Sequence, residues 1–232
     1  MRLILASASP RRAELLREAG FTFEICAVEV DERVRAGETA ASYVRRLAAE
    51  KSTLAAIVVR GPAEAERHVR NGPAKAGHYV REDLREDARE DAREEVVVLG
   101  ADTAVVVDDE ILGKPRDDSD AAAMLHRLSG RSHDVMTGVS VRSGVREVGR
   151  VETTAVYFVP LSRAEIAWYV ASGEGRHKAG GYAIQGLALR FISRVEGSYS
   201  NVVGLPMDCV HELLKELGVD YSGGRLGSRK SL

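Results

Sequence analysis

A turn rich in hydroxyl and guanidinium groups lies near the N-terminus, in the sequence Ser7-Ala8-Ser9-Pro10-Arg11-Arg12. It follows an apolar stretch that predicts a buried strand, and Pro10 suits the first position of a helix. Unpaired N–H groups and the helix dipole favour an anion at such a point. Arginine donors also match phosphate oxygens. The turn therefore indicates a phosphate site, with an ordinary serine N-cap and exposed arginines as the alternative. No Walker-type glycine-lysine sequence is present.

Other charged residues could complete such a site. Asp102 stands within Gly-Ala-Asp-Thr after a β-branched run, where we expect the end of a buried strand and either a turn residue or a catalytic carboxylate. Lys51 and Lys114 could reach a phosphate or could simply be solvated. Asp31-Glu32 offers the oxygen ligands that hard divalent cations require, although a solvated turn also explains this pair.

A glycine-rich segment runs from Lys178 to Gly186 (KAGGYAIQG). Glycines on either side of Tyr182 and Gln185 would let the backbone approach a flat ligand closely. The side-chain amide of Gln185 can donate and accept hydrogen bonds together, which suits the edge of a nucleobase. A glycine-rich strand edge or bulge is the alternative interpretation.

The elements that must position these residues alternate along the chain. Apolar spacing and turn residues predict strands at 2–6, 22–30, 96–107 (interrupted at 100–103), 133–142, 147–159 and 188–195, and helices at 10–19, 39–58, 117–129, 162–172 and 206–217. Strands alternating with helices at both ends, with a hairpin between, favour a mixed α/β sheet over a regular parallel one. We expect one domain over residues 1–220.

Two segments depart from this pattern. Residues 60–95 contain a charged four-residue repeat (REDLREDAREDAREE) with almost no apolar content, which predicts a solvated insertion. A partner-binding arm is the alternative for this segment. Residues 221–232 are typical of a flexible C-terminal tail.

Composition excludes several classes of protein. The chain of 232 residues is 44% hydrophobic and 29% charged, with a net charge of −2, so any anion site must be a local concentration of basic residues. Cys26 and Cys209 are far apart and are best explained as buried free thiols. No apolar run approaches the roughly 18 residues of a membrane span. We expect a cytoplasmic protein that binds neither membranes nor nucleic acid.

Together these segments resemble the Maf (septum-formation-type) nucleoside triphosphate pyrophosphatases. The resemblance runs from Leu3 to about Leu217, except for 60–95, and its motifs occur in the family's order, which makes it specific. They are SASPRR (7–12), VDE (30–32), LAAEKS (47–52), GADTAV (100–105), LGKP (112–115), LSGRSHDVMTGV (128–139), KAGGYAIQG (178–186) and GSYSNVVGLP (197–206).

The resemblance implies a catalytic role for Asp102, as the base that activates water. It implies that Arg11, Thr103 and Gln185 separate the family's subgroups, and here they look like the subgroup acting on dTTP and UTP. A related subgroup acting on 7-methyl-GTP carries different residues at these positions. His177 is a departure, because the family usually has an acidic residue just before Lys178.

The remaining implications concern phosphate and metal binding. Ser7, Arg12, Lys51 and Lys114 correspond to the family's phosphate ligands, and Glu32 to its acidic segment near a divalent cation, Mg²⁺ or Mn²⁺. The family's fold is a mixed α/β sheet that forms an elongated two-lobed cleft, often in a homodimer. Two alternatives stay open: a nucleotide-binding regulator of cell division without turnover, and a pyrophosphatase for purine nucleotides such as ITP.

Overall fold

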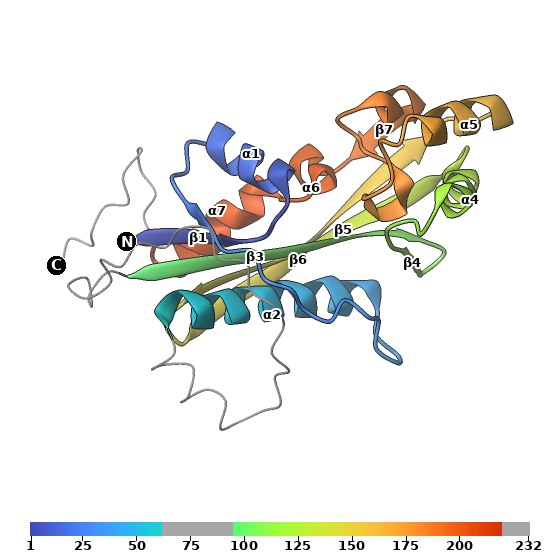
Figure 1. The fold of residues 1–232 in the computed structure, drawn as a ribbon. Helices are drawn as coiled ribbons and strands as arrows, with labels where there is room; N and C mark the ends of the chain where they lie inside the picture. Colours follow the sequence, from blue (N-terminus) through green and yellow to red (C-terminus); the bar gives the residue numbers. More distant parts are fainter. Residues whose placement is uncertain (62–94, 220–232) are drawn as a thin grey trace.

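The computed structural model describes residues 1–61 and 95–219. A seven-stranded mixed sheet runs the length of this part, in the order β2-β1-β3-β5-β6-β7 with β4 paired to β3, and helices cover both faces (Figure 1). The prediction of a mixed α/β sheet is confirmed. The strands are β1 (Arg2–Ala6), β2 (Glu24–Ile25), β3 (Val96–Val107), β4 (Glu110–Leu112), β5 (Ser132–Ser143), β6 (Arg146–Phe158) and β7 (Ile192–Glu196).

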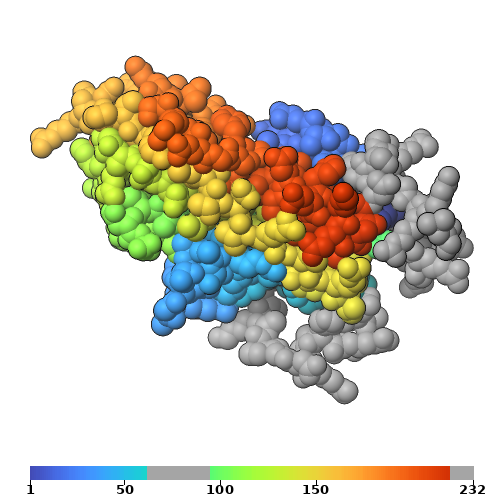
Figure 2. All heavy atoms as spheres, turned by 180° about the vertical axis from the view of Figure 1, so that it is seen from behind, coloured from blue at the N-terminus to red at the C-terminus, as the bar shows by residue number. Residues whose placement is uncertain are grey.

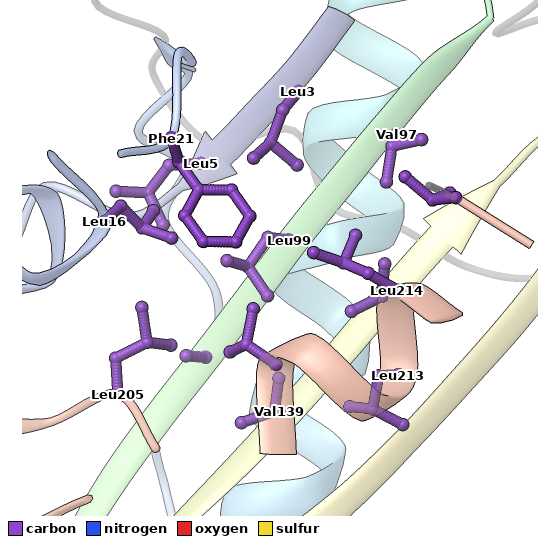
Figure 3. Packing of buried hydrophobic residues seen from close by; sticks show 14 of the residues in the cluster. Leu3, Leu5, Leu16, Phe21, Val97, Leu99, Val139, Leu205, Leu213 and Leu214 are labelled. Carbon is purple, nitrogen blue, oxygen red and sulfur yellow. The ribbon is translucent and has the colours of Figure 1, made fainter. Parts of the chain in front are cut away.

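The helices are α1 (Pro10–Glu18), α2 (Ala40–Arg60), α4 (Asp118–Leu128), α5 (Arg163–Ala171), α6 (Tyr199–Val203) and α7 (Met207–Glu216), with two 3-10 turns, η1 (Ala179–Gly181) and η2 (Leu187–Phe191). Helices α1 and α7 lie on one face of the sheet and α2 on the other (Figure 1). Seen from behind, α7 lies beside β6 (Figure 2). The core on the α1 and α7 side joins Leu5, Leu16, Leu99, Val139 and Leu213 (Figure 3).

The central strand β3 has three neighbours. It is parallel to β1 over 96–100, antiparallel to β5 over 97–106, and antiparallel to β4 over 105–107. Strand β5 pairs with one edge of β3, and β1 and β4 share the other edge. On that second edge, residues 101–104 lie between β1 and β4 and pair with neither strand. Asp108 and Asp109 make the turn into β4 with φ of 52° and 61°, a left-handed conformation that aspartate tolerates.

Strand β3 is continuous, so the predicted interruption at 100–103 is wrong. Asp102 lies within the strand, opposite Gly138 of β5, and not at a strand end. The glycines serve helix packing: a Cβ on Gly100 would lie 2.3 Å from the carbonyl oxygen of Ala48, and one on Gly138 would lie 2.2 Å from that of Val44. Both contacts are with α2, which therefore lies directly against the backbone of β3 and β5.

Other boundaries also differ from the predictions. The strand expected over 22–30 is reduced to β2, and the first half of the strand expected over 188–195 forms η2. Helix α6 was not predicted. Apart from residues 60, 61 and 95, the predicted insertion lies outside the described residues, as does the tail at 221–232. No helix in the described ranges combines the length and the apolar character that crossing a membrane requires.

Candidate active site

A pocket of about 690 Å³ opens beside the uncovered stretch of β3, where β1 ends and α1 begins. Successive side chains of a strand point to opposite faces. Asp102 therefore faces Lys51 of α2, while Thr103 faces Arg12 of α1 on the other side of the sheet. Eight of the residues predicted for the site line this pocket: Ser7, Arg11, Arg12, Glu32, Lys51, Asp102, Thr103 and Lys114.

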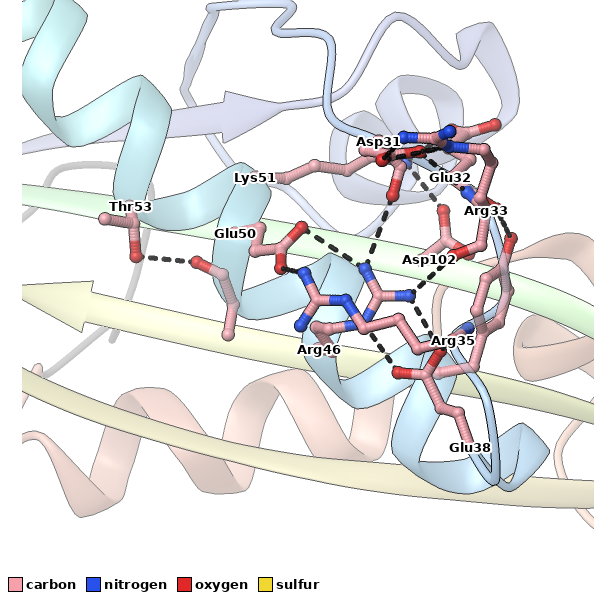
Figure 4. Close-up of polar contacts among 12 residues, drawn as sticks. Asp31, Glu32, Arg33, Arg35, Glu38, Arg46, Glu50, Lys51, Thr53 and Asp102 are labelled. Atoms are coloured by element: carbon pink, nitrogen blue, oxygen red, sulfur yellow. Dashed lines mark hydrogen bonds and ion pairs between the residues drawn. The ribbon is translucent and has the colours of Figure 1, made fainter. Parts of the chain in front are cut away.

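Two lysines and two carboxylates form a charged cluster on the α2 side of the pocket. The Lys51 ammonium lies 2.6 Å from Oδ1 of Asp102 and 3.1 Å from Oε1 of Glu32 (Figure 4). Lys114 Nζ lies 3.5 Å from the other oxygen of Glu32. Burial works against ionisation of Glu32, but the charges of Lys51 and Lys114 outweigh it and hold its pKa below the ordinary value. Glu32 is therefore held in its charged form, and each carboxylate of the cluster already has a lysine partner.

Arg12 joins four segments behind the N-terminal turn. Its Nε donates to the carbonyl of Gly204, one terminal nitrogen donates to Ser7 Oγ and to the carbonyl of Ala101, and the other donates to Thr103 Oγ1, all at 2.8–3.0 Å. These bonds leave a single N–H of the guanidinium for a ligand. Burial lowers its pKa, and the charges of Asp102 and Glu32 oppose this shift. Arg12 holds the turn against β3 as much as it faces the pocket.

The turn itself remains able to receive an anion. Ser9 precedes α1, and its hydroxyl makes no capping hydrogen bond to the helix. Ser9 therefore occupies the N-cap position of the alternative interpretation without a side-chain capping bond, and Arg12 is buried, not exposed as that interpretation expects. Arg11 and Lys178 also line the pocket. Burial and the positive charge of Arg11 lower the pKa of Lys178, as expected where cations gather.

The loop that carries Glu32 is tied to α2. Arg46 donates to both carboxylate oxygens of Glu38 and to the carbonyls of Asp31 and Arg33 (Figure 4). The Tyr43 hydroxyl donates to the carbonyl of Glu32 at 2.9 Å. These contacts surround Glu32 on both sides and fix the backbone from which its carboxylate reaches Lys51.

Asp102 and Glu32 are the carboxylates that could share a cation here, because both contact the same ammonium group. Within residues 1–61 and 95–219, no group of three or more His, Cys, Asp or Glu is arranged to hold a metal. Two carboxylates suit Mg²⁺, which keeps several waters and is commonly bound through one or two carboxylates and substrate phosphates. The donor set therefore fits a cation that arrives with a phosphate ligand.

Gln185 is the predicted site residue that the structure does not bring into the pocket lining. Its side chain is exposed, whereas its neighbours Ala183 and Ile184 line the pocket. Sequence reasoning also left Lys178, Tyr182 and Gly204 without a role, although all three line the pocket. Their motifs were recognised, but the contact of Arg12 with Gly204 spans 192 positions, and no local pattern reveals such a contact.

Comparison with known proteins agrees with this architecture. The family model described as Maf-like protein matches residues 2–217. A protein of Symbiobacterium thermophilum named dTTP/UTP pyrophosphatase is 43% identical, over 96% of this chain and 97% of its own. Proteins with the same name from Anaeromyxobacter sp. Fw109-5 and Shewanella oneidensis are 45% and 44% identical, over 94% of this chain and 90% and 100% of theirs. With a match over nearly its whole length, this chain belongs to the Maf family.

Proposed function

We propose that this protein hydrolyses pyrimidine nucleoside triphosphates, dTTP and UTP and also modified pyrimidine nucleotides, to the nucleoside monophosphate and pyrophosphate. The observation that carries the proposal is the buried carboxylate of Asp102, placed beside Lys51 in a pocket that Arg11, Lys114 and Lys178 also line. Relatives that align over nearly their whole length are named dTTP/UTP pyrophosphatase.

In this proposal a water molecule attacks the α-phosphorus and the bond from that phosphorus to the bridging oxygen breaks. Asp102 accepts a proton from the water, and pyrophosphate leaves with the bridging oxygen. Such reactions depend on positioning and charge neutralisation more than on covalent chemistry. The buried setting of Asp102 within the most central strand gives the carboxylate a fixed direction relative to the pocket.

The basic residues take the phosphates. Ser7, Lys51 and Lys114 would bind phosphate oxygens, and Arg12 would add its remaining N–H while holding the turn in place. A polyanion that draws the Lys51 ammonium toward itself would also release Asp102 from the ion pair, so substrate binding and formation of the base would occur together. A divalent cation, Mg²⁺ or Mn²⁺, would be held by Glu32 and Asp102 and would neutralise phosphate charge.

Arg11, Thr103 and Gln185 would select the base. A site that hydrogen-bonds one base edge leaves its own polar groups unpaired with a wrong base. Thr103 is already fixed from two sides, because its hydroxyl accepts from Arg12 and shares a hydrogen bond with Thr137 at 2.9 Å. Gln185 would act from the rim, since its side chain is exposed beside pocket-lining residues.

The test is a panel of nucleoside triphosphates with Mg²⁺ or Mn²⁺, scored for pyrophosphate against orthophosphate. Pyrophosphate from dTTP and UTP is expected from the wild type and not from Asp102→Asn. Asp208→Asn, at an exposed position of α7, is the matched control and should keep full activity. Orthophosphate release would contradict attack at the α-phosphorus. Nucleotide binding without turnover would favour the regulator, and preference for ITP the purine enzyme.

A homodimer, on the family resemblance, and a cytoplasmic location also belong to this proposal. Sedimentation velocity of the purified chain and fractionation of cells that express it would test the two statements.

A further inference from the structure

The segment from Tyr182 to Leu187 forms part of the pocket wall near α4, α5 and β7, at one end of the molecule (Figure 1). Ala183 and Ile184 line the pocket, and Gln185 follows them at the rim. A hydrogen bond from the N–H of Gly186 to the carbonyl of Ala183, at 3.2 Å, closes the segment into a turn. The shape of this turn decides where Gln185 stands relative to the pocket.

Two side chains outside the pocket lining hold both ends of this turn. The N–H of Ala183 donates to the hydroxyl of Tyr169 at 3.1 Å, and that hydroxyl donates to Oε1 of Glu174 at 3.4 Å. The N–H of Leu187 donates to the carboxylate of Glu174, at 2.8 Å and 3.1 Å to its two oxygens. One connected group of hydrogen bonds therefore fixes the positions immediately before and after Ile184, Gln185 and Gly186.

Gly186 makes room for this arrangement. A Cβ built there would lie 1.9 Å from Oε1 of Glu174. Its φ of −127° is open to any residue, so the glycine is required by the carboxylate and not by the backbone. Any side chain at this position must push Glu174 away from the N–H of Leu187.

Apart from the bond from the Tyr169 hydroxyl of α5, the hydrogen bonds that the Glu174 carboxylate accepts come from this turn. Glu174 follows α5, which ends at Ala171, and its backbone is held separately by the hydroxyl of Ser172. Tyr169 is 1% exposed and is anchored in the core against Phe191, with ring centroids 5.6 Å apart. A buried aromatic side chain and a carboxylate thus hold a turn whose residues Ala183 and Ile184 line the pocket.

We propose that Glu174 and Tyr169 are positioning residues that hold residues 183–187 in the conformation that discriminates between bases. This inference rests on the proposed function, because it concerns the base-selecting part of the same pocket. Neither side chain touches the nucleotide in this account. Both act through the backbone of the turn that carries Gln185.

The first test measures nucleotide selectivity without turnover. In an Asp102→Asn background, the ratio of the dissociation constants for dCTP and dTTP is measured by calorimetry. Glu174→Ala and Tyr169→Phe should each reduce this ratio by about tenfold, through weaker dTTP binding, because small misplacements of a positioned group are costly. Glu174→Gln, which keeps an acceptor oxygen for the N–H of Leu187, should retain part of the wild-type ratio. Glu165→Ala is the control.

Glu165 is matched because its carboxylate also accepts a backbone N–H, that of Ser162, but at the opposite end of α5. Its removal should leave the ratio unchanged. An equal loss of selectivity in Glu165→Ala would mean that α5 stability, not the grip on the turn, is responsible. Equal affinity of the parent for dTTP and dCTP would also overturn the inference, whether or not the wild type releases pyrophosphate.

The second test examines the turn in the free protein. Amide hydrogen exchange at Ala183 and Leu187 should accelerate at least tenfold in Glu174→Ala, and not in Glu165→Ala. Gly186→Ala should reproduce the effect, and combining it with Glu174→Ala should add nothing further, because both changes break the same contacts. Unchanged exchange at these amides, or faster exchange with unchanged selectivity, would overturn the proposal. Failure of the proposed reaction alone would appear only as absent pyrophosphate release.

Discussion

The ammonium group of Lys51 lies 2.6 Å from Oδ1 of Asp102, in a contact between α2 and β3 where both side chains are nearly buried. The partners are not equivalent. Lys51 has a second carboxylate, Glu32, at 3.1 Å, whereas Lys51 is the cation paired with Asp102 among the described residues. Loss of the Lys51–Asp102 contact therefore leaves Lys51 with another partner, Glu32, but leaves Asp102 with no cation among the described residues.

We accordingly predict that Lys51→Met destabilises the protein more than Asp102→Asn. The first change leaves a buried carboxylate without a cation, which costs about 3–5 kcal/mol. The second leaves Lys51 paired with Glu32 and should cost about 1 kcal/mol. Urea unfolding of both variants, with Lys215→Met on α7 as a surface control, measures the difference. Equal losses of unfolding free energy would contradict this account.

The hydrogen bonds of Arg12 predict a difference between the two neighbouring arginines. Arg12→Lys should lower the free energy of unfolding by about 2–4 kcal/mol, because an ammonium cannot bond Ser7, Ala101, Thr103 and Gly204 together. Arg11→Lys should leave stability within about 0.5 kcal/mol and weaken nucleotide binding. Thermal unfolding and calorimetric titration separate the two effects. Loss of binding without loss of stability in Arg12→Lys would make Arg12 a phosphate ligand only.

Much of the fold could be predicted from the sequence, because the signals were local. Pro10 and the apolar spacing after it predict α1, and the apolar spacing of residues 117–129 predicts α4. The pocket could not be placed in this way. It exists because β1 and β4 pair with the same edge of β3 and leave 101–104 uncovered, and strand pairing over such separations has no local signature.

The error at Gly100 has the same origin. Glycine within a β-branched run usually indicates a turn. Here the absence of a side chain at Gly100 lets α2 pack against β3, and the close contact is with Ala48. For Gln185 the motif identified a segment that lies at the pocket. It did not show that Ala183 and Ile184 line the pocket while Gln185 is exposed. Residue types therefore indicated the chemistry, whereas long-range packing determined the geometry.

Close packing of α2 on the sheet gives a prediction for Gly138. Gly138→Ala should destabilise the protein by about 3 kcal/mol or more, since the new methyl group meets the backbone of Val44 at 2.2 Å and backbone cannot swing aside. Gly113→Ala is the control, because no atom of residues 1–61 or 95–219, its own chain neighbours aside, lies within 4 Å of a Cβ there. Denaturant midpoints at constant m-value provide the comparison. A Gly138→Ala protein as stable as Gly113→Ala would refute the packing argument.

Arg46 gives a prediction about the acidic loop. Arg46→Gln removes the bonds to Glu38 and to the carbonyls of Asp31 and Arg33, so Glu32 should lose its fixed position. We expect the concentration of Mg²⁺ required for half-maximal activity to rise about tenfold, because an ordered ligand binds better than a mobile one. Arg33→Gln, at an exposed side chain that pairs with Asp31 two positions away, is the control. An unchanged requirement for Mg²⁺ would show that Glu32 does not hold the cation.

His133 gives a prediction about acid stability. Its Nε2 lies 2.7 Å from the hydroxyl of Tyr182, which lines the pocket, and burial lowers the pKa of His133 to about 4. The unfolded chain has the ordinary value of about 6.5 and therefore binds more protons between the two values. Its contribution to stability is complete above about pH 6.5 and is lost as the pH falls toward 4.

We therefore expect the stability advantage of the wild type over His133→Gln to shrink by roughly 3 kcal/mol between pH 7 and pH 4. Urea unfolding at a series of pH values measures this difference, and the effect should be greatest between pH 6 and pH 4.5. His126→Gln, at an exposed position of α4, should follow the wild-type curve throughout. A constant gap between wild type and His133→Gln would show that the imidazole stays neutral in both states or charges equally in both, and that its burial beside Tyr182 does not govern acid unfolding.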